Sequence, residues 1–189
     1  MKATLRKTRI SISPATDAGA DVQSDSQGID KQEVPMSITK DFRYKVDVAW
    51  DGDRITNVTS PDKPELTVAT PPEFKNGVPG VWSPEDLLVA AVASCYAVTL
   101  VAVAERRDLP LRELHVSGTG HLTGRDDGRF GFVAIELTVT ILTDEPALDA
   151  IERTARYAER ACMVTMALDV PVHVEVVVRP VTNVREIVV

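Results

Sequence analysis

The feature that most constrains the fold is an uncharged stretch of eighteen residues, Leu87 to Ala104. A stretch of this length reaches the size of a membrane span. Its Ala, Ser, Thr and Cys residues dilute the hydrophobicity, and no second span follows, so we expect no membrane partner. A helix that is apolar on every side is otherwise buried. A single sheet-and-helix layer can hardly cover it all round, so the pattern predicts that a second copy of the chain does.

The ends of this helix are marked by the residues on either side of the stretch. Ser83 is a good N-cap, Pro84 suits the first helical position, and Asp86 completes an approximate capping box. Pro110 stands shortly after the last apolar residue, which ends the helix near Arg107. The sequence therefore predicts one long helix between Ser83 and about Arg107.

Hydrophobic periodicity places strands before and after this helix. Alternation of apolar and polar residues, bounded by Gly and Pro, is typical of half-buried strands, whereas apolar residues three and four apart indicate a helix. The resulting order, β-β-β-α-β-β-α-β, mixes hairpins with two helices and predicts an α+β fold. The expected elements besides the long helix are strands at 42–50, 54–58, 65–70, 113–122, 130–142 and 172–178, a helix at 146–160, and a helical turn around Cys162.

The composition predicts one globular domain with a tail at each end. Residues 1–37 are rich in Ser, Asp, Gly, Ala and Gln, which indicates a disordered tail, with the domain at 38–181 and a short tail at 182–189. The net charge of -7 excludes an ordinary nucleic-acid partner, because little would neutralise the phosphates. Two cysteines and no apolar leader favour a reducing, cytoplasmic location, where a cysteine pair is more often catalytic or redox-sensing than a permanent disulfide.

The two cysteines lie in segments that resemble a known family. Cys95 ends the string Ser-Pro-Glu-Asp-Leu-Leu-Val-Ala-Ala-Val-Ala-Ser-Cys, and Cys162 opens the string Cys-Met-Val-Thr-Met-Ala-Leu. Both strings, at this spacing and on these predicted elements, resemble the OsmC/Ohr family of osmotically induced protein C and organic hydroperoxide resistance proteins. The resemblance covers about residues 41–180. Within the family, the sequence is more similar to the OsmC-like members than to typical Ohr members.

That resemblance implies an intertwined homodimer, with long central helices wrapped by antiparallel β-sheets, acting in defence against oxidative or osmotic stress. It implies thiol-dependent reduction of hydroperoxides, with a dithiol such as a dihydrolipoyl group as reductant and with neither metal nor organic cofactor. Cys95 would be the attacking residue and Cys162 the resolving one. Glu85 matches the family's glutamate, which holds an activating arginine, and Arg54 is the arginine in the corresponding region.

Elementary thiol chemistry agrees with these roles. A thiolate attacks the O–O bond and becomes a sulfenic acid, which a second thiol converts to a disulfide. An apolar lining would suit an organic peroxide, and the expected lining residues are Leu88, Val92, Tyr96, Val164 and Met166.

Two alternatives stay open at the level of sequence. Ten residues of helix span about 15 Å, so Glu85 and Cys95 of one chain cannot touch. Either an arginine bridges that distance, or Glu85 serves the Cys95 of a partner chain.

The other function to consider is a non-catalytic dimer of the same fold that binds an apolar small molecule, since fold alone does not fix function.

Overall fold

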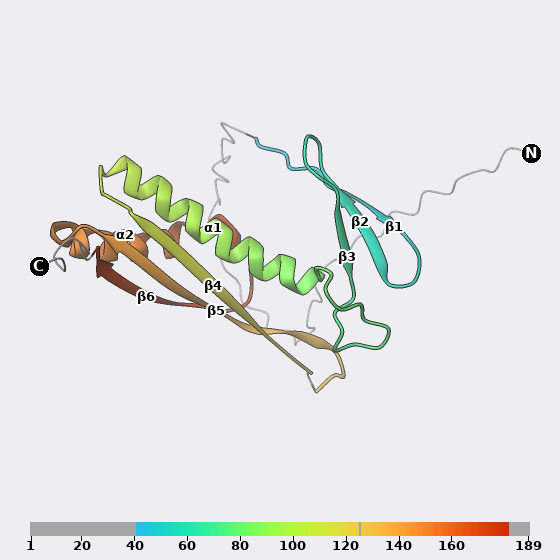
Figure 1. The fold of residues 1–189 in the computed structure, drawn as a ribbon. Coiled ribbons are helices and arrows are strands. Elements are labelled where there is room, and N and C mark those ends of the chain that lie inside the picture. The colour runs from blue at the N-terminus through green and yellow to red at the C-terminus, as the bar shows by residue number, and fades with distance from the viewer. Residues whose placement is uncertain (1–40, 125, 182–189) are drawn as a thin grey trace, which may run out of the picture. The chain divides into compact units, whose positions relative to one another are not determined.

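A computed structural model describes residues 41–124 and 126–181. The predicted tails at 1–37 and 182–189 lie outside the described residues. The chain divides into two compact units, Met1–Arg43 and Tyr44–Val189. In the described part of the first unit, Arg43 Nε donates to Asp41 Oδ2 at 2.8 Å. The elements described below all belong to the second unit (Figure 1).

The first sheet consists of three short antiparallel strands in the order β1-β2-β3. They span Asp47–Trp50, Ile55–Thr59 and Leu66–Ala69. The turn between β1 and β2 contains Gly52 at φ 97° and Asp53 at φ 41°, a backbone region that Gly and Asp tolerate. Strand β1 begins at Asp47, later than the alternation from Phe42 predicts. Periodicity reports which side chains share a face, whereas a strand also needs a partner for each backbone group.

Helix α1, Pro84–Arg106, confirms the predicted long helix and its caps. The Ser83 hydroxyl accepts the Asp86 N–H at 3.0 Å, and Asp86 Oδ2 accepts the Ser83 N–H at 2.9 Å. These reciprocal bonds satisfy two N–H groups that the first turn would leave without partners. The Ala69 N–H donates to the Trp82 carbonyl at 2.9 Å, which joins the start of the helix to the first sheet.

The second sheet has the order β4-β5-β6, with the strands at Glu113–Gly124, Phe130–Thr143 and Val172–Pro180. β4 pairs antiparallel with β5, as the hairpin predicts, but β6 runs parallel to β5. The connection between β5 and β6 explains the direction, because it is a helical crossover. It contains the 3-10 turn η1, Glu145–Ala147, then α2, Leu148–Ala161, and the single turn α3, Met163–Met166.

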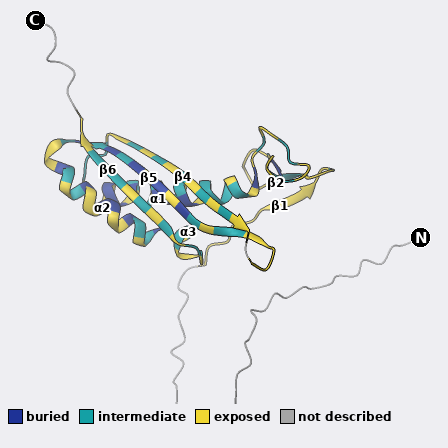
Figure 2. Cartoon of the chain, turned by 90° about the horizontal axis from the view of Figure 1, so that it is seen from below, coloured by how far each residue is buried: buried dark blue, intermediate teal, exposed yellow. Residues whose placement is uncertain are grey.

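The core lies between the second sheet and its two helices. β5 alternates buried and less buried residues, and its inward side chains are fully buried (Figure 2). Tyr96 of α1 is 1% exposed, and its hydroxyl donates to the Ala155 carbonyl of α2 at 3.2 Å. The ring is therefore buried without leaving its polar group unpaired. The buried cluster comprises Val92, Tyr96, Leu100 and Ala104 of α1, Ile135, Leu137, Val139 and Ile141 of β5, Ala147, and Ile151, Ala155, Ala158 and Cys162.

The opposite side of α1 is not covered by the chain itself. Ala91, Ser94, Val98 and Ala102 are exposed, with the three- and four-residue spacing of one helix face. By length and composition α1 could cross a membrane, yet 33% of its most apolar 18-residue window is buried within the protein. The predicted burial of α1 on every side is therefore only partly met within one chain.

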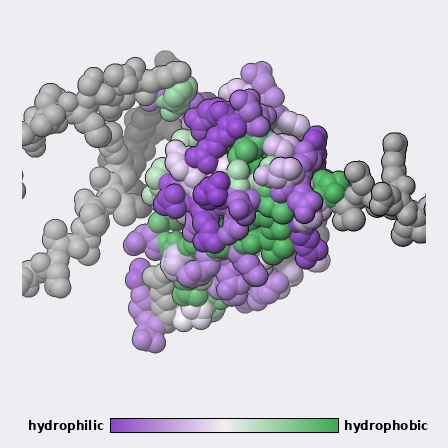
Figure 3. Space-filling view, turned by 90° about the vertical axis from the view of Figure 1, so that its left-hand side faces the viewer, coloured by the Kyte–Doolittle hydropathy of each residue, from purple (hydrophilic) through white to green (hydrophobic). Residues whose placement is uncertain are grey.

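Apolar side chains are exposed elsewhere too. Along β1 and the residues before it, Tyr44, Val46, Val48 and Trp50 alternate with polar residues and are each more than 60% exposed. On the face that Figure 3 draws, apolar side chains gather in a patch bordered by hydrophilic ones. Exposed apolar surface of this extent is typical of an interaction site.

Candidate active site

The two cysteines meet in the folded chain although the sequence places them far apart. Cys95 lies in the middle of α1 and is partly exposed, whereas Cys162 is 0% exposed at the junction of α2 and α3. Extended backbone at Cys162, with φ -70° and ψ 110°, turns the chain from α2 into α3. This turn directs the Cys162 side chain into the core, where it interacts with the thiol of Cys95. The structure thus brings the predicted attacking and resolving residues together as free thiols.

The surroundings of the Cys162 sulfur favour its ionised form. Burial alone would raise the pKa of this thiol, but the side chain and N–H of Thr165, the Cys95 thiol and the Val164 N–H interact with the sulfur and together lower the pKa below its ordinary value. The turn that carries these donors is fixed by backbone hydrogen bonds, among them the one from the Met166 N–H to the Cys162 carbonyl at 3.1 Å. A thiol with a lowered pKa is a better nucleophile near neutral pH and a better leaving group from a disulfide.

Arg54 and Glu85 lie apart from the two cysteines. Both line a pocket of about 310 Å³ at the start of α1. Arg54 lies in the turn between β1 and β2 and is exposed. Glu85 occupies the first turn of α1, and its Oε2 atom is buried without a hydrogen-bond partner among the described residues. No ion pair joins the two side chains in the part of the chain described, so both charges are available to a further group. The other lining residues are Thr70, Pro71, Phe74, Pro84, Leu122 and Phe130.

The two pairs remain separate within one chain. Glu85 and Cys95 lie on the same uninterrupted helix, and ten residues of helix correspond to about 15 Å. Among the described residues, neither cysteine lines the pocket of Arg54 and Glu85. The structure therefore places all four predicted site residues, as two pairs at two positions along α1.

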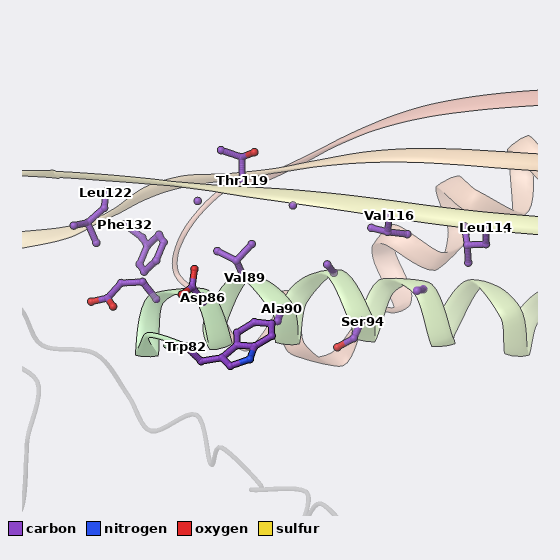
Figure 4. Close-up of a pocket in the computed structure, with 15 residues that line it drawn as sticks. Trp82, Asp86, Val89, Ala90, Ser94, Leu114, Val116, Thr119, Leu122 and Phe132 are labelled. Carbon is purple, nitrogen blue, oxygen red and sulfur yellow. The ribbon is translucent and has the colours of Figure 1, made fainter. Parts of the chain in front are cut away.

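A groove of about 750 Å³ lies between α1 and β4, and sequence reasoning did not identify it. In Figure 4, Val89 points from α1 toward β4, and Thr119 points from β4 away from α1. Trp82 lies along the start of α1. Small residues keep the groove open, because a Cβ on Gly120 would come within 2.5 Å of Phe132. Further lining residues include Ala90, Ala93, Ala97, Leu114, Val116, Gly118 and Leu122. The small residues of α1 and the glycines of β4 were the available signal.

This groove also corrects the expected lining. Val92 and Tyr96 were expected to face a peroxide, but they are 0% and 1% exposed and belong to the core on another face of α1. Val164 packs against the same core, and Met166 is exposed. The error arises because an apolar helix gives no periodicity from which its faces can be distinguished.

Comparison with known proteins relates this geometry to a family. Residues 77–177 match the family model described as OsmC-like protein. The uncharacterized protein YmaD of Bacillus subtilis is 24% identical over 132 residues, which is 68% of this chain and 87% of that protein.

Solved structures show the same fold. An OsmC-like protein of unknown function from Vibrio cholerae superposes with a TM-score of 0.66 at 16% identity, covering 72% of this chain and 99% of that one. An organic hydroperoxide resistance protein from Elizabethkingia anophelis, with crystallant-derived thiocyanate bound, gives 0.62 at 19% identity, covering 76% and 99%.

Proposed function

Because the chain belongs to the OsmC-like protein family, we propose that it reduces organic hydroperoxides with its two thiols. The observation that carries the proposal is the interaction between the thiols of Cys95 and Cys162, which brings a second thiol to the residue that would be oxidised. The name of the related organic hydroperoxide resistance protein supports the class of substrate. A cytoplasmic location, where thiols are kept reduced, is part of the proposal.

The proposed reaction has three steps. The Cys95 thiolate attacks one oxygen of the hydroperoxide, which breaks the O–O bond, releases the alcohol and leaves Cys95 as a sulfenic acid. The Cys162 thiolate then attacks the Cys95 sulfur and expels hydroxide, which leaves as water, to give the disulfide. The lowered pKa of Cys162 favours this second step, because the resolving thiol must also be ionised. An external dithiol, such as a dihydrolipoyl group, reduces the disulfide.

A turnover assay tests this function. Cumene hydroperoxide and dihydrolipoamide are supplied, and peroxide loss is followed for the wild type, Cys95→Ser and Cys162→Ser. We expect catalytic turnover only in the wild type, with at most one sulfenic acid per chain in Cys162→Ser. If folded protein with both thiols reduced shows no turnover with any dithiol, the proposed peroxidase function is excluded.

We further propose that the active unit is a homodimer. The exposed face of α1, with Val98 66% exposed at its middle, and the apolar side chains of β1 provide a surface for a second copy. Two copies of α1 running antiparallel would bring the Arg54 and Glu85 of one chain toward the Cys95 of the other, and Arg54 would then stabilise its thiolate. This arrangement resolves the separation of about 15 Å within one chain.

Mixed dimers test the shared site. One chain carries Cys95→Ser and the other Glu85→Gln, so that a site shared between chains leaves both defects in one site and the other site intact. We expect about half of the wild-type activity from this pairing, and much less from a mixed dimer in which one chain carries both substitutions and its partner carries neither. Equal losses from Glu85→Gln in either pairing, or a monomer in sedimentation experiments, would contradict the proposal.

The groove between α1 and β4 favours a second candidate function. It is largely apolar, and among the described residues neither cysteine lines it. A non-catalytic dimer could bind an apolar small molecule there. Quenching of Trp82 fluorescence by such a molecule, undiminished in Cys95→Ser, together with no peroxide turnover, would favour this function.

A further inference from the structure

We propose that an external thiol attacks the sulfur of Cys95 in the Cys95–Cys162 disulfide, that Cys162 leaves as the thiolate, and that Thr165 is the positioning residue that receives it. This inference rests on the proposed function, because it concerns the step that restores the thiols. It assigns a direction to a disulfide whose two sulfurs are chemically alike, and it gives a role to a side chain that takes no other part in the reaction.

Access to solvent distinguishes the two sulfurs. Thiol–disulfide exchange requires the attacking thiolate to reach the sulfur opposite the bond that breaks. Cys162 is 0% exposed and is part of the buried cluster between α1, α2 and β5. Cys95 is partly exposed, and the proposed function already requires a hydroperoxide to reach it. An attacking thiol therefore reaches Cys95 from outside, whereas the side of Cys162 remote from Cys95 is filled by the protein.

The stability of the departing thiolate points in the same direction. A sulfur leaves a disulfide more readily where the protein stabilises the departing thiolate. Thr165 interacts with the Cys162 sulfur through both its side chain and its N–H, and these contacts oppose the effect of burial on the pKa. The Leu168 N–H donates to the Thr165 carbonyl at 3.2 Å, which fixes the backbone at Thr165. The Thr165 hydroxyl is thus already in place when negative charge develops on Cys162.

The exchange balances in two steps. In the first, the thiolate of the reductant forms a bond to the Cys95 sulfur, the Cys95–Cys162 bond breaks, and its electron pair remains on Cys162. In the second, the other thiolate of a dithiol attacks the reductant's own sulfur in the mixed disulfide and releases Cys95. The reductant becomes a disulfide, and two protons from solution complete the two protein thiols.

Trapping of the mixed disulfide tests the direction. The full-length protein is oxidised with diamide, so no hydroperoxide is needed, and is then mixed with N-acetylcysteine. After a short interval excess N-ethylmaleimide in denaturing buffer is added, which alkylates whichever cysteine has been released. Peptide mass spectrometry should find N-acetylcysteine on Cys95 and maleimide on Cys162, in at least roughly tenfold excess over the reverse pattern, as expected where one sulfur is inaccessible. Equal amounts, an excess of the reverse pattern, or failure of diamide to join the cysteines would overturn the proposal.

Substitution of Thr165 tests its role as a positioning residue. Thr165→Val should slow the reaction with N-acetylcysteine by a factor of roughly three to ten, because the leaving thiolate loses a hydrogen bond. It should also move upward the pH midpoint of Cys162 ionisation, followed by the ultraviolet absorbance of the thiolate in a Cys95→Ser background, and Thr165→Ser should restore both values. Thr140→Val, which removes a partly buried hydroxyl on β5, is the matched control and should change neither. An unchanged rate and midpoint in Thr165→Val would exclude the role.

The two proposals fail separately. If the protein has no peroxidase activity, the diamide-formed disulfide still reports which sulfur is attacked. If N-acetylcysteine is found on Cys162, the direction of attack is wrong, but the peroxidase assay with dihydrolipoamide still decides whether hydroperoxides are reduced.

Discussion

The close approach of α1 and β4 leads to a quantitative prediction for Gly120→Ala. A Cβ at Gly120 would lie 2.5 Å from Phe132 Cε1 and 2.7 Å from Val89 Cγ2, so both side chains must move. Forcing extra volume into a packed site costs about 1–3 kcal/mol. Replacement of Gly by Ala in a strand also stabilises by about 0.5–1 kcal/mol, because it reduces the freedom of the unfolded chain. The net expected loss is therefore about 0–2.5 kcal/mol.

Gly124→Ala provides a matched control on the same strand. Its Cβ would meet only Phe130, at 3.8 and 3.9 Å, which is ordinary van der Waals contact. The backbone gain is common to both variants, so the difference between their unfolding free energies isolates the packing term of about 1–3 kcal/mol.

Urea denaturation at one fixed protein concentration measures that difference. With a slope near 2 kcal/mol per molar urea, the midpoint of Gly120→Ala should fall below that of Gly124→Ala by about 0.5–1.5 M. The slope itself should not change. Coincident midpoints would refute the close contact of Gly120 with Val89 and Phe132, and with it the geometry of the groove.

Three further predictions concern other parts of the structure. Ser83→Ala should lower the unfolding free energy by about 1 kcal/mol, because it breaks the capping box of α1; an unchanged urea midpoint would contradict the cap. Tyr96→Phe should cost about 1 kcal/mol at neutral pH through the lost bond to the Ala155 carbonyl. Burial, and then Glu159, raise the pKa of Tyr96, so the stabilisation is complete below the unfolded-state pKa and is lost as pH rises through the folded one; wild type and Tyr96→Phe should therefore converge in alkali, and a constant difference would argue against burial. A hydrogen bond from Arg112 lowers the pKa of Asp144, so the stability difference between wild type and Asp144→Asn should be present above the unfolded-state pKa and vanish as pH falls through the folded one; a difference that persists in acid would contradict the ion pair.

Local patterns were sufficient to predict the elements whose causes are local. The start of α1 follows from Ser83, Pro84 and Asp86, whose capping interactions involve residues three apart. The second hairpin follows from alternation on both sides of a turn-rich loop, and β4 and β5 form it. The parallel direction of β6 was not predictable in this way, because alternation is the same whichever way a strand runs.

The arrangement of the candidate site was likewise not predictable from local patterns. No periodicity indicates that Cys95 and Cys162 touch, and that expectation came from resemblance to a family, as did the association of Arg54 with Glu85. The structure supplies what neither source gave, namely the burial of Cys162 and the contacts of Thr165 with its sulfur. Those depend on how α2 ends and α3 begins, which a sequence of apolar residues does not specify.

The redox pairing of Cys95 and Cys162 is the central claim, and one oxidation experiment tests it most directly. Reduced wild-type protein is treated with cumene hydroperoxide at one molecule per chain, quenched with N-ethylmaleimide, and mapped by mass spectrometry without reduction. We expect both thiols to disappear together, with Cys95 and Cys162 joined within one chain. A sulfinic acid on Cys95 beside an alkylated Cys162, or two alkylated thiols with the peroxide unconsumed, would contradict the claim.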